Sequence, residues 1–177
     1  IKNINSFYSD KIYNIGTHLI DCIRMIINLE PSSTFSTFSS SIRKNDPSVS
    51  GIINFKNNIK CFIQSLGKKY DYVFEIDIMG SKGRLRITNN GKKIEIFKFL
   101  NSKNFSKYKE LKKIHFNKLL IKQKKVSIDP MKNLFIKGIE AFEKKKKISP
   151  NIYDGYQNLL TASSMERSAR LNKHIKI

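Results

Sequence analysis

Apolar and β-prone residues recur in short runs along the chain, several with a period of two. These runs predict strands over residues 1–8, 32–42, 50–56, 59–66, 72–79, 84–88 and 93–99. Asn57 and Asn58 separate two of the runs, and an Asn-Asn-Gly sequence at residues 89–91 separates two others, as expected for tight hairpin turns. Five or more such strands in succession predict an antiparallel meander.

Apolar residues at helical spacing predict three helices. The first begins near Thr17 and ends near Leu29, because Pro31 cannot continue it. The second follows residues 129–130, an Asp-Pro pair typical of a helix start. The third covers residues 154–171, with Asp154 as its N-cap. Among the lysine-rich residues 100–125, only 114–116 suggest an element, a strand or a loop, and residues 174–177 suggest a short terminal strand.

This order of elements predicts an α+β fold: a largely antiparallel, open-faced sheet of five or more strands with about three helices packed on one face. The 177 residues suit a single domain covering residues 1–177. The other face of the sheet would carry Phe62, Val73, Phe97 and Phe99. Because an exposed apolar face usually meets another subunit, we expect a homodimer or tetramer formed through the open sheet face.

The formal charge of +20 and the pI near 10.0 would ordinarily suggest a nucleic-acid partner. Lys, Ile and Asn are abundant together, however, as an AT-rich coding sequence produces, and the lysines are spread along the chain. The sequence holds no module signature that reads bases. We therefore expect a solvated basic surface and no nucleic-acid partner; a nucleic-acid binder would lose affinity steeply as salt rises.

Cysteine use and hydropathy indicate the compartment. Cys22 and Cys61 are far apart and each lies in an apolar period, which predicts reduced, buried thiols. No apolar run approaches the ~20 residues that span a bilayer, and no signal peptide opens the sequence. We expect a cytoplasmic protein with no membrane partner. Since the chain begins with Ile1, we also expect a domain of a longer protein.

The residues of greatest chemical interest gather at 13–21, YNIGTHLID. Gly16 and Thr17 predict a turn and a helix start, where glycine tolerates an unusual backbone angle and the threonine hydroxyl caps free amides. His18 and Asp21 would then lie on neighbouring positions near the positive end of the helix dipole. An imidazole placed there suits an acid, a base or a polar anchor. A capped structural histidine is the alternative interpretation.

Three segments together resemble the Gfo/Idh/MocA oxidoreductases: GTHLID at 16–21, EIDIMGSKGRLRI at 75–87 and DGYQNLLTASSMERSARLNKHIKI at 154–177. In that family an N-terminal Rossmann domain binds NAD(P), and a C-terminal α+β domain supplies an open sheet and much of the substrate pocket. This chain resembles only the C-terminal domain. Its GSKG sequence lies between two antiparallel-type strands and indicates a hairpin turn, so no cofactor-binding residue is expected in this chain.

The resemblance implies a parent enzyme that transfers hydride between NAD or NADP and a sugar, nucleotide sugar or polyol. His18 would exchange the proton of the reacting hydroxyl or hold its oxygen, and Asn14 would orient the substrate. Family members commonly have Asp where this chain has Asn14. The carboxylate that would relay a proton with the histidine is therefore missing here. Asp21 matches a frequent family Asp, assigned mainly to structure with substrate contact as the alternative. Thr17 is a cap or a pocket hydroxyl, and the cap is favoured.

Other polar residues have ordinary explanations. His115 and His174 are expected at the surface, and the three histidines share no metal-ligand spacing, so no metal site is predicted. Arg84 and Arg86 lie on one strand face after GSKG. They would meet an anionic substrate, meet a partner subunit, or cover a solvated sheet face, and the sequence leaves these alternatives open.

The leading hypothesis is therefore the substrate-binding and oligomerisation domain of an NAD(P)-dependent oxidoreductase, inactive as an isolated chain. The alternative is a stand-alone, non-catalytic binding or scaffold module with the same fold. The missing cofactor domain and Asn14 both favour that alternative, whereas the GTHLID motif favours the enzyme.

Overall fold

The computed structural model describes residues 1–39, 47–67, 72–104, 107–114, 130–146, 148 and 150–177. The chain divides into two compact units, which are described separately. One comprises Ile1–Ile114 together with Gln157–Ile177, and the other comprises His115–Tyr156. Asp129 and His115, to which the sequence assigned a helix cap and a surface position, lie outside the described residues.

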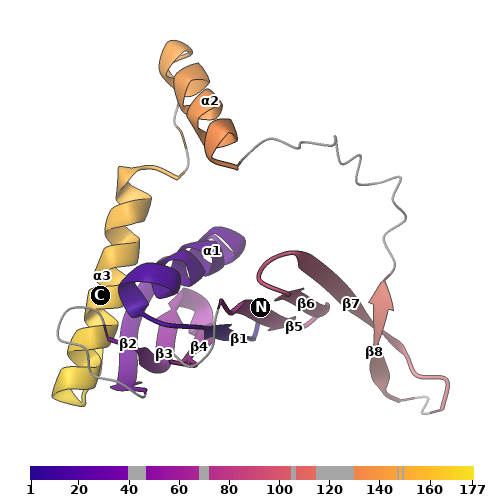
Figure 1. Ribbon diagram of the computed structural model, residues 1–177. Coiled ribbons are helices and arrows are strands. Elements are labelled where there is room, and N and C mark those ends of the chain that lie inside the picture. The colour runs from indigo at the N-terminus through magenta and orange to yellow at the C-terminus, as the bar shows by residue number, and fades with distance from the viewer. Residues whose placement is uncertain (40–46, 68–71, 105–106, 115–129, 147, 149) are drawn as a thin grey trace. The chain divides into compact units, whose positions relative to one another are not determined.

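The larger unit is built on one sheet, which Figure 1 shows in ribbon form. Its strands are β1 (Asn3–Tyr8), β2 (Pro31–Phe38), β3 (Val49–Phe55), β4 (Lys60–Ser65), β5 (Phe74–Gly80), β6 (Gly83–Thr88), β7 (Lys93–Asn101), β8 (Lys109–Ile114) and β9 (Ile175–Lys176). The strand order among the described residues is β8-β7-β6-β5-β1-β4-β3-β2-β9. Each neighbouring pair is antiparallel except β1 and β4. The predicted α+β class and the largely antiparallel open sheet are confirmed.

The strands do not form a single meander, and the prediction of one was wrong. β1 lies in the middle of the sheet, parallel to β4 on one side and antiparallel to β5 on the other. The chain leaves the sheet after β1 through the π-helical turn η1 (Ile12–Gly16) and helix α1 (Thr17–Ile27), then returns as β2. This helical connection places the YNIGTHLID segment directly after a central strand.

The hairpins form where the asparagines predicted them. Asn57 and Asn58, in the 3₁₀ turn η2 (Lys56–Asn58), have φ values of 61° and 56°. Asn89 and Asn90 have φ values of 52° and 55° between β6 and β7. Asparagine tolerates this left-handed backbone region better than other side chains, because it bonds locally to the main chain.

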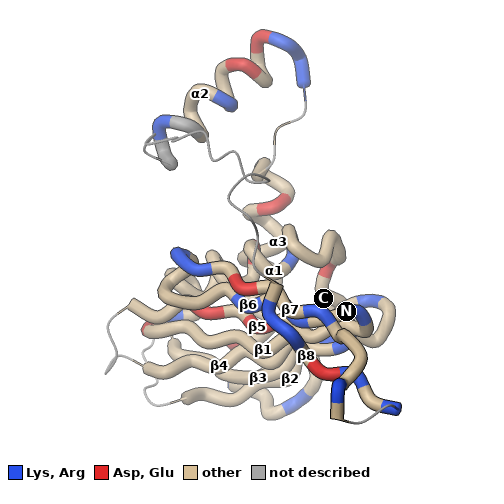
Figure 2. The backbone as a smooth tube through the Cα atoms, turned by 90° about the vertical axis from the view of Figure 1, so that its right-hand side faces the viewer, with Lys and Arg blue, Asp and Glu red and all other residues tan. Residues whose placement is uncertain are grey.

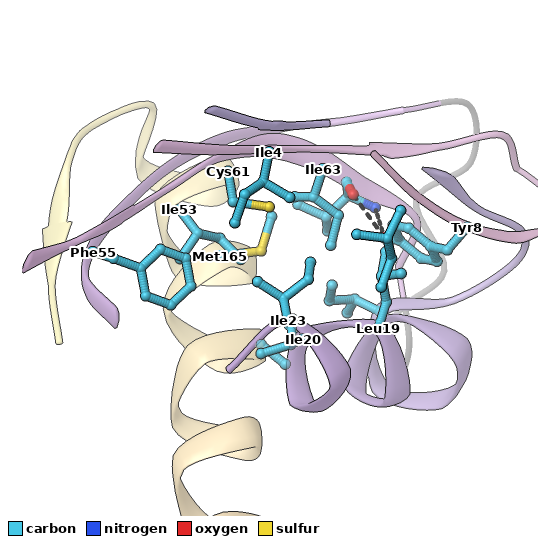
Figure 3. Packing of buried hydrophobic residues seen from close by; sticks show 14 of the residues in the cluster. Ile4, Tyr8, Leu19, Ile20, Ile23, Ile53, Phe55, Cys61, Ile63 and Met165 are labelled. Atoms are coloured by element: carbon cyan, nitrogen blue, oxygen red, sulfur yellow. Dashed lines mark hydrogen bonds between the residues drawn. The ribbon is translucent and has the colours of Figure 1, made fainter. Parts of the chain in front are cut away.

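Helices α1 and α3 (Ile152–Leu171) cover one face of the sheet with a common core. Leu19, Ile20 and Ile23 of α1 are at most 1% exposed. In Figure 3 they face the sheet residues Ile53 and Ile63. Each such aliphatic side chain contributes about 1.5–3 kcal/mol when fully buried. The other core residues from the sheet and from α3 are Ile4, Tyr8, Val49, Phe55, Ile59, Cys61, Ile76, Ile78, Ala162 and Met165.

The two cysteines are free thiols. Cys61 is fully buried, as predicted, and burial raises its pKa to about 12. Cys22 is half-buried. A thiol in an apolar site resists ionisation, so Cys61 acts as a small core residue.

Strand β8 was missed by the sequence analysis. Its sequence is KELKKI, and its residues are exposed or half-buried. It pairs with β7 from Asn101↔Lys109 to Ile96↔Ile114, so backbone pairing holds β8 in place at the edge of the sheet. Strand β2 ends at Phe38, while residues 40–42 of the predicted strand lie outside the described residues.

Two helix termini differ from the predictions. Asn151 caps α3 in place of Asp154: its Oδ1 accepts hydrogen bonds from the N–H groups of Tyr153 (2.8 Å) and Asp154 (3.3 Å). Asp154 Oδ2 accepts the Asn151 N–H at 2.8 Å, which completes a reciprocal capping box. Helix α1 ends at Ile27, where Asn28 (φ 53°) terminates it before Leu29.

The smaller unit contains α2 (Pro130–Glu143), so the predicted second helix is confirmed. Its apolar residues include Phe135 and Phe142, which are 68% and 86% exposed. They line a groove of about 460 Å³ together with Leu134, Gly138, Ile139, Ile148 and Pro150. No described helix is long and apolar enough to cross a bilayer.

The second face of the sheet is open: within the larger unit, both described α-helices lie on the first face. Phe62 is 42% exposed there, and Phe97 and Phe99 are half-buried on the same face, as the strand register requires. Val73 is half-buried and precedes β5. Charges gather at β5 to β8, whereas β1 to β3 carry none, as Figure 2 shows.

Candidate functional site

The candidate segment begins as a π turn. The Gly16 N–H donates to the Lys11 carbonyl at 3.1 Å, which is the i to i−5 bond of a π-helix. Single π turns of this kind are frequent at functional sites, since they redirect side chains at a helix end. Gly16 has an ordinary helical φ of −59°, so the prediction of an unusual backbone angle was wrong. Glycine is required by packing: a Cβ there would lie 2.8 Å from Ile12 Cδ1 and 3.3 Å from Tyr8 Cε2.

Thr17 does not cap the helix. No side-chain hydrogen bond caps the start of α1. The Thr17 hydroxyl instead donates backwards, to the Asn14 carbonyl at 2.7 Å and the Tyr13 carbonyl at 3.3 Å. The preceding π turn explains the difference. Its carbonyl groups lie within reach of the first amides of α1 and of the Thr17 hydroxyl, so no side-chain cap is needed. The predicted cap is therefore a brace across the turn.

His18 and Asn14 both lie exposed at the start of the helix. They are four residues apart, so they occupy neighbouring positions on one side of the helical segment. Leu19 and Ile20, which follow His18, are fully buried. The buried residues fix the helix against the sheet and leave the imidazole and the amide facing outward, where they can meet a ligand.

Asp21 lies one turn later and faces an arginine that sequence reasoning missed. Arg24 is only 5% exposed, and its Nη1 lies 3.4 Å from Asp21 Oδ1. Its Nε and Nη2 donate to both carboxylate oxygens of Glu30, each at 2.7 Å, and Nη1 donates to Asn158 Oδ1 at 3.0 Å. Arg24 occupies the apolar stripe of α1 four residues after Ile20. An arginine among the apolar positions of a helix indicates a buried ion pair, so the sequence could have identified Arg24.

Tyr13 is a second residue that the sequence analysis did not single out. Its hydroxyl donates to Glu166 Oε2 on α3 at 2.6 Å. The other oxygen of Glu166 accepts from Arg170 Nε at 2.9 Å. Tyr13 and Glu166 are 153 positions apart, and nothing in the local pattern of either segment signals their contact.

The structure thus brings Asn14, Thr17, His18 and Asp21 together on one turn and the helix that follows. His174 lies elsewhere, stacked on Phe35 with ring centroids 4.9 Å apart. Among the described residues, no three His, Cys, Asp or Glu side chains gather as a metal ion would require. A groove of about 530 Å³ lies beyond the other end of α1, between Ile26 and strands β5 to β7, and contains none of the four site residues.

Arg84 and Arg86 lie on the open face of the sheet and pair with acids of neighbouring strands. Arg84 Nε donates to Asp77 Oδ1 at 2.8 Å, a contact that raises the pKa of Arg84. Arg86 lies 3.7 Å from Asp77 and 3.9 Å from Glu95. Both guanidinium groups thus pair with carboxylates within the sheet, on the face opposite α1, although the buried Nε of Arg86 makes no hydrogen bond.

Glu95 is the centre of the same network. It contacts Lys113 Nζ at 2.6 Å and Lys93 Nζ at 3.1 Å. Hydrogen bonds from Lys113 and then Lys93 lower the pKa of Glu95 to about 2. The network joins β6, β7 and β8 across the open face.

Residues 8–86 match the family profile described as the GFO/IDH/MocA C-terminal domain. This stretch is similar to the Gfo/Idh/MocA C-terminal domains and covers less than half of the chain. The matched stretch includes Tyr13, Asn14, His18 and Arg24, whereas Glu166 lies beyond it. No curated protein sequence matches the chain.

Solved structures share the fold of this chain. Levoglucosan dehydrogenase in complex with NADH and levoglucosan matches with a TM-score of 0.76 and 15% identity, over 100% of this chain and 58% of that one. A putative myo-inositol dehydrogenase from Sinorhizobium meliloti 1021 matches with a TM-score of 0.65 and 21% identity, over 99% and 56%. An oxidoreductase domain protein from Kribbella flavida matches with a TM-score of 0.78 and 12% identity, over 99% and 59%. The chain therefore spans less than two thirds of these proteins.

Proposed function

We propose that this chain is the substrate-binding and oligomerisation domain of an NAD(P)-dependent oxidoreductase that acts on a sugar, nucleotide sugar or polyol. The observation that carries the proposal is the exposed pair Asn14 and His18, held at the start of a buried helix within the matched family domain. The names of the fold relatives support the substrate class, since levoglucosan dehydrogenase was solved with NADH and with levoglucosan or L-sorbose.

The described GSKG turn does not fit a dinucleotide site, and in this proposal the cofactor would be held by another domain. The GSKG segment forms the tight turn between β5 and β6. A Cβ at Gly83 would lie 2.0 Å from the Phe97 carbonyl oxygen, so this glycine serves the close approach of two strands rather than of a phosphate. In this proposal the isolated chain does not catalyse the reaction.

His18 would take or give the proton of the substrate hydroxyl whose carbon exchanges hydride with the nicotinamide. Asn14, four residues earlier, would orient the sugar through its amide, which both donates and accepts hydrogen bonds. Asp21 faces Arg24 and would shape the helix. Thr17 would hold the turn rather than the substrate, because its hydroxyl already donates to two carbonyls.

The open face of the sheet would pair with a second copy of the chain, giving a dimer or tetramer. Apolar Phe62 lies near one half of this face, and the mixed charges of Asp77, Arg84 and Glu95 occupy the other. A face that carries both signs of charge beside apolar side chains can complement a copy of itself. A cytoplasmic location belongs to the same proposal, since both cysteines are free thiols.

Sedimentation of the protein tests this interface. Phe62→Asp would place a carboxylate in the apolar part of the face and is expected to shift the protein to a smaller species. Lys60→Asp, on the same face of β4, is the matched control for added negative charge. An unchanged sedimentation coefficient for Phe62→Asp, or an equal shift for both variants, would contradict pairing through Phe62.

The activity itself is tested with the full-length protein, NAD or NADP, and a panel of sugars and polyols, by following the absorbance of the reduced nicotinamide. Turnover that depends on both a sugar and a nicotinamide supports the proposal. Binding of a sugar without turnover would favour the stand-alone, non-catalytic module instead.

A further inference from the structure

Two polar contacts join the segment that carries His18 to helix α3. One is the hydrogen bond from the Tyr13 hydroxyl to Glu166, at 2.6 Å, and the other runs from Arg24 to Asn158, at 3.0 Å. The first lies before His18 and the second lies after it. Arg24 of α1 meets the first turns of α3, whereas Tyr13 of η1 meets a later residue of α3. Figure 1 shows them side by side.

The Tyr13 contact is strong for a single hydrogen bond. Its acceptor is a carboxylate that is 18% exposed, so water competes weakly for it. Arg170 holds the second oxygen of the same carboxylate, at 2.9 Å from Nε, and is itself 5.6 Å from the centre of the Phe38 ring on β2. Glu166 is therefore held through both carboxylate oxygens, one by Arg170 on its own helix and the other by Tyr13.

Hydrogen bonds continue from Tyr13 to the site. The Tyr13 carbonyl accepts from the Thr17 hydroxyl at 3.3 Å, and the same hydroxyl donates to the Asn14 carbonyl at 2.7 Å. His18 follows Thr17 directly. The Thr17 hydroxyl links Tyr13 and Asn14 across the turn, and His18 is the next residue of the chain, so a rotation of the π turn would move the three residues together.

We propose that Tyr13 and Glu166 are positioning residues for the site, and that α3 sets the direction of Asn14 and His18 through their hydrogen bond. This inference rests on the proposed function of His18. The fold does not depend on the contact, because Leu19, Ile20 and Ile23 already hold α1 in the core. The expected consequence of its loss is a misdirected imidazole in a folded protein.

Kinetics of the full-length protein test the proposal. Tyr13→Phe keeps the ring and removes the hydroxyl, and is expected to lower kcat at least tenfold with little change in KM and in melting temperature. Glu166→Ala should do the same, whereas Glu166→Gln retains an accepting oxygen and should recover most of the lost kcat. Tyr156→Phe, at a 58% exposed position of α3, is the matched control and should leave kcat unchanged. Wild-type kcat in Tyr13→Phe would overturn the proposal.

A second readout needs no turnover. The imidazole signals of His18 in an NMR spectrum of the same protein should shift in Tyr13→Phe and Glu166→Ala, and stay in place in Tyr156→Phe and Glu166→Gln. If the wild-type protein has no activity on any sugar, the proposed function fails, yet shifted His18 signals still support the positioning contact. Unshifted signals in Tyr13→Phe overturn that contact whatever the activity.

Discussion

Gly16 occupies a position where a side chain does not fit. A Cβ there would meet Ile12 and Tyr8, both fully buried, at 2.8 Å and 3.3 Å. Neither neighbour can retreat without disturbing the core below the π turn. The residue therefore links the backbone of the candidate site to the end of β1, which supplies Tyr8, and to the turn itself, which supplies Ile12.

Gly16→Ala is expected to destabilise the protein by about 1–2 kcal/mol, because over-packing outweighs the helix preference of alanine. Urea unfolding of the purified chain measures the change. The control is Gly80→Ala, where the nearest atom to an added Cβ lies 3.7 Å away and the effect should stay within about 1 kcal/mol. Equal losses in both variants would show that packing around Gly16 is not tight.

At the residue scale the sequence predicted part of the site. The YNIGTHLID segment at 13–21 contains the predicted site residues Asn14, Thr17, His18 and Asp21, and the structure places them on one turn and the helix that follows. The sequence did not reveal that the Thr17 hydroxyl braces the turn, because a hydroxyl at a helix start usually accepts hydrogen bonds from the free amides. Here the hydroxyl donates to a carbonyl of the preceding π turn instead. The contact of Tyr13 with Glu166 depends on how two distant helices cross, which no local pattern encodes.

At the element scale, strands β6, β7 and β8 are held together by charge as well as by backbone pairing. Glu95 on β7 is the shared acid of Lys93, Lys113 and Arg86. Two lysine partners lower its pKa to about 2. A carboxyl group with a depressed pKa stabilises the folded state above its unfolded pKa, near 4.3, and loses that contribution as the pH falls towards 2.

Glu95→Gln is therefore expected to lower the melting temperature above pH 5 and to leave it unchanged near pH 2, where Glu95 itself becomes protonated. Thermal unfolding of the variant and the wild type between pH 2 and pH 7 measures the difference. Glu140→Gln, in which the replaced side chain is 57% exposed, provides the control for loss of an exposed carboxylate. A constant difference at every pH would mean that the Glu95 charge does not contribute.

The same strands show which elements a sequence can and cannot predict. The hairpins formed where Asn and Gly allow a left-handed backbone, and α1 formed where apolar residues repeat at helical spacing. Strand β8 gave no signal, since KELKKI is mostly polar and owes its strand form to pairing with β7. The central place of β1 likewise depends on long-range pairing with β4 and β5, which alternation alone does not specify.

At the scale of the whole molecule, the sheet separates two surfaces with different expected partners. The face covered by α1 and α3 carries the exposed His18 at a helix start, and the open face carries Phe62 and the charge network. In our proposal the first surface meets the substrate and the second meets another copy of the chain. The separation allows a variant on one surface to be tested without disturbing the other.

The measurement that tests the central claim most directly is the kinetics of His18→Ala in the full-length protein. If His18 moves the substrate proton, kcat/KM should fall by about 10²–10⁴-fold, the usual contribution of general acid or base catalysis, while the melting temperature stays near that of the wild type. Met25→Ala, at a 72% exposed position of the same helix, should leave both quantities unchanged. A parallel loss of melting temperature and activity in His18→Ala, or undiminished activity, would contradict a catalytic role for His18.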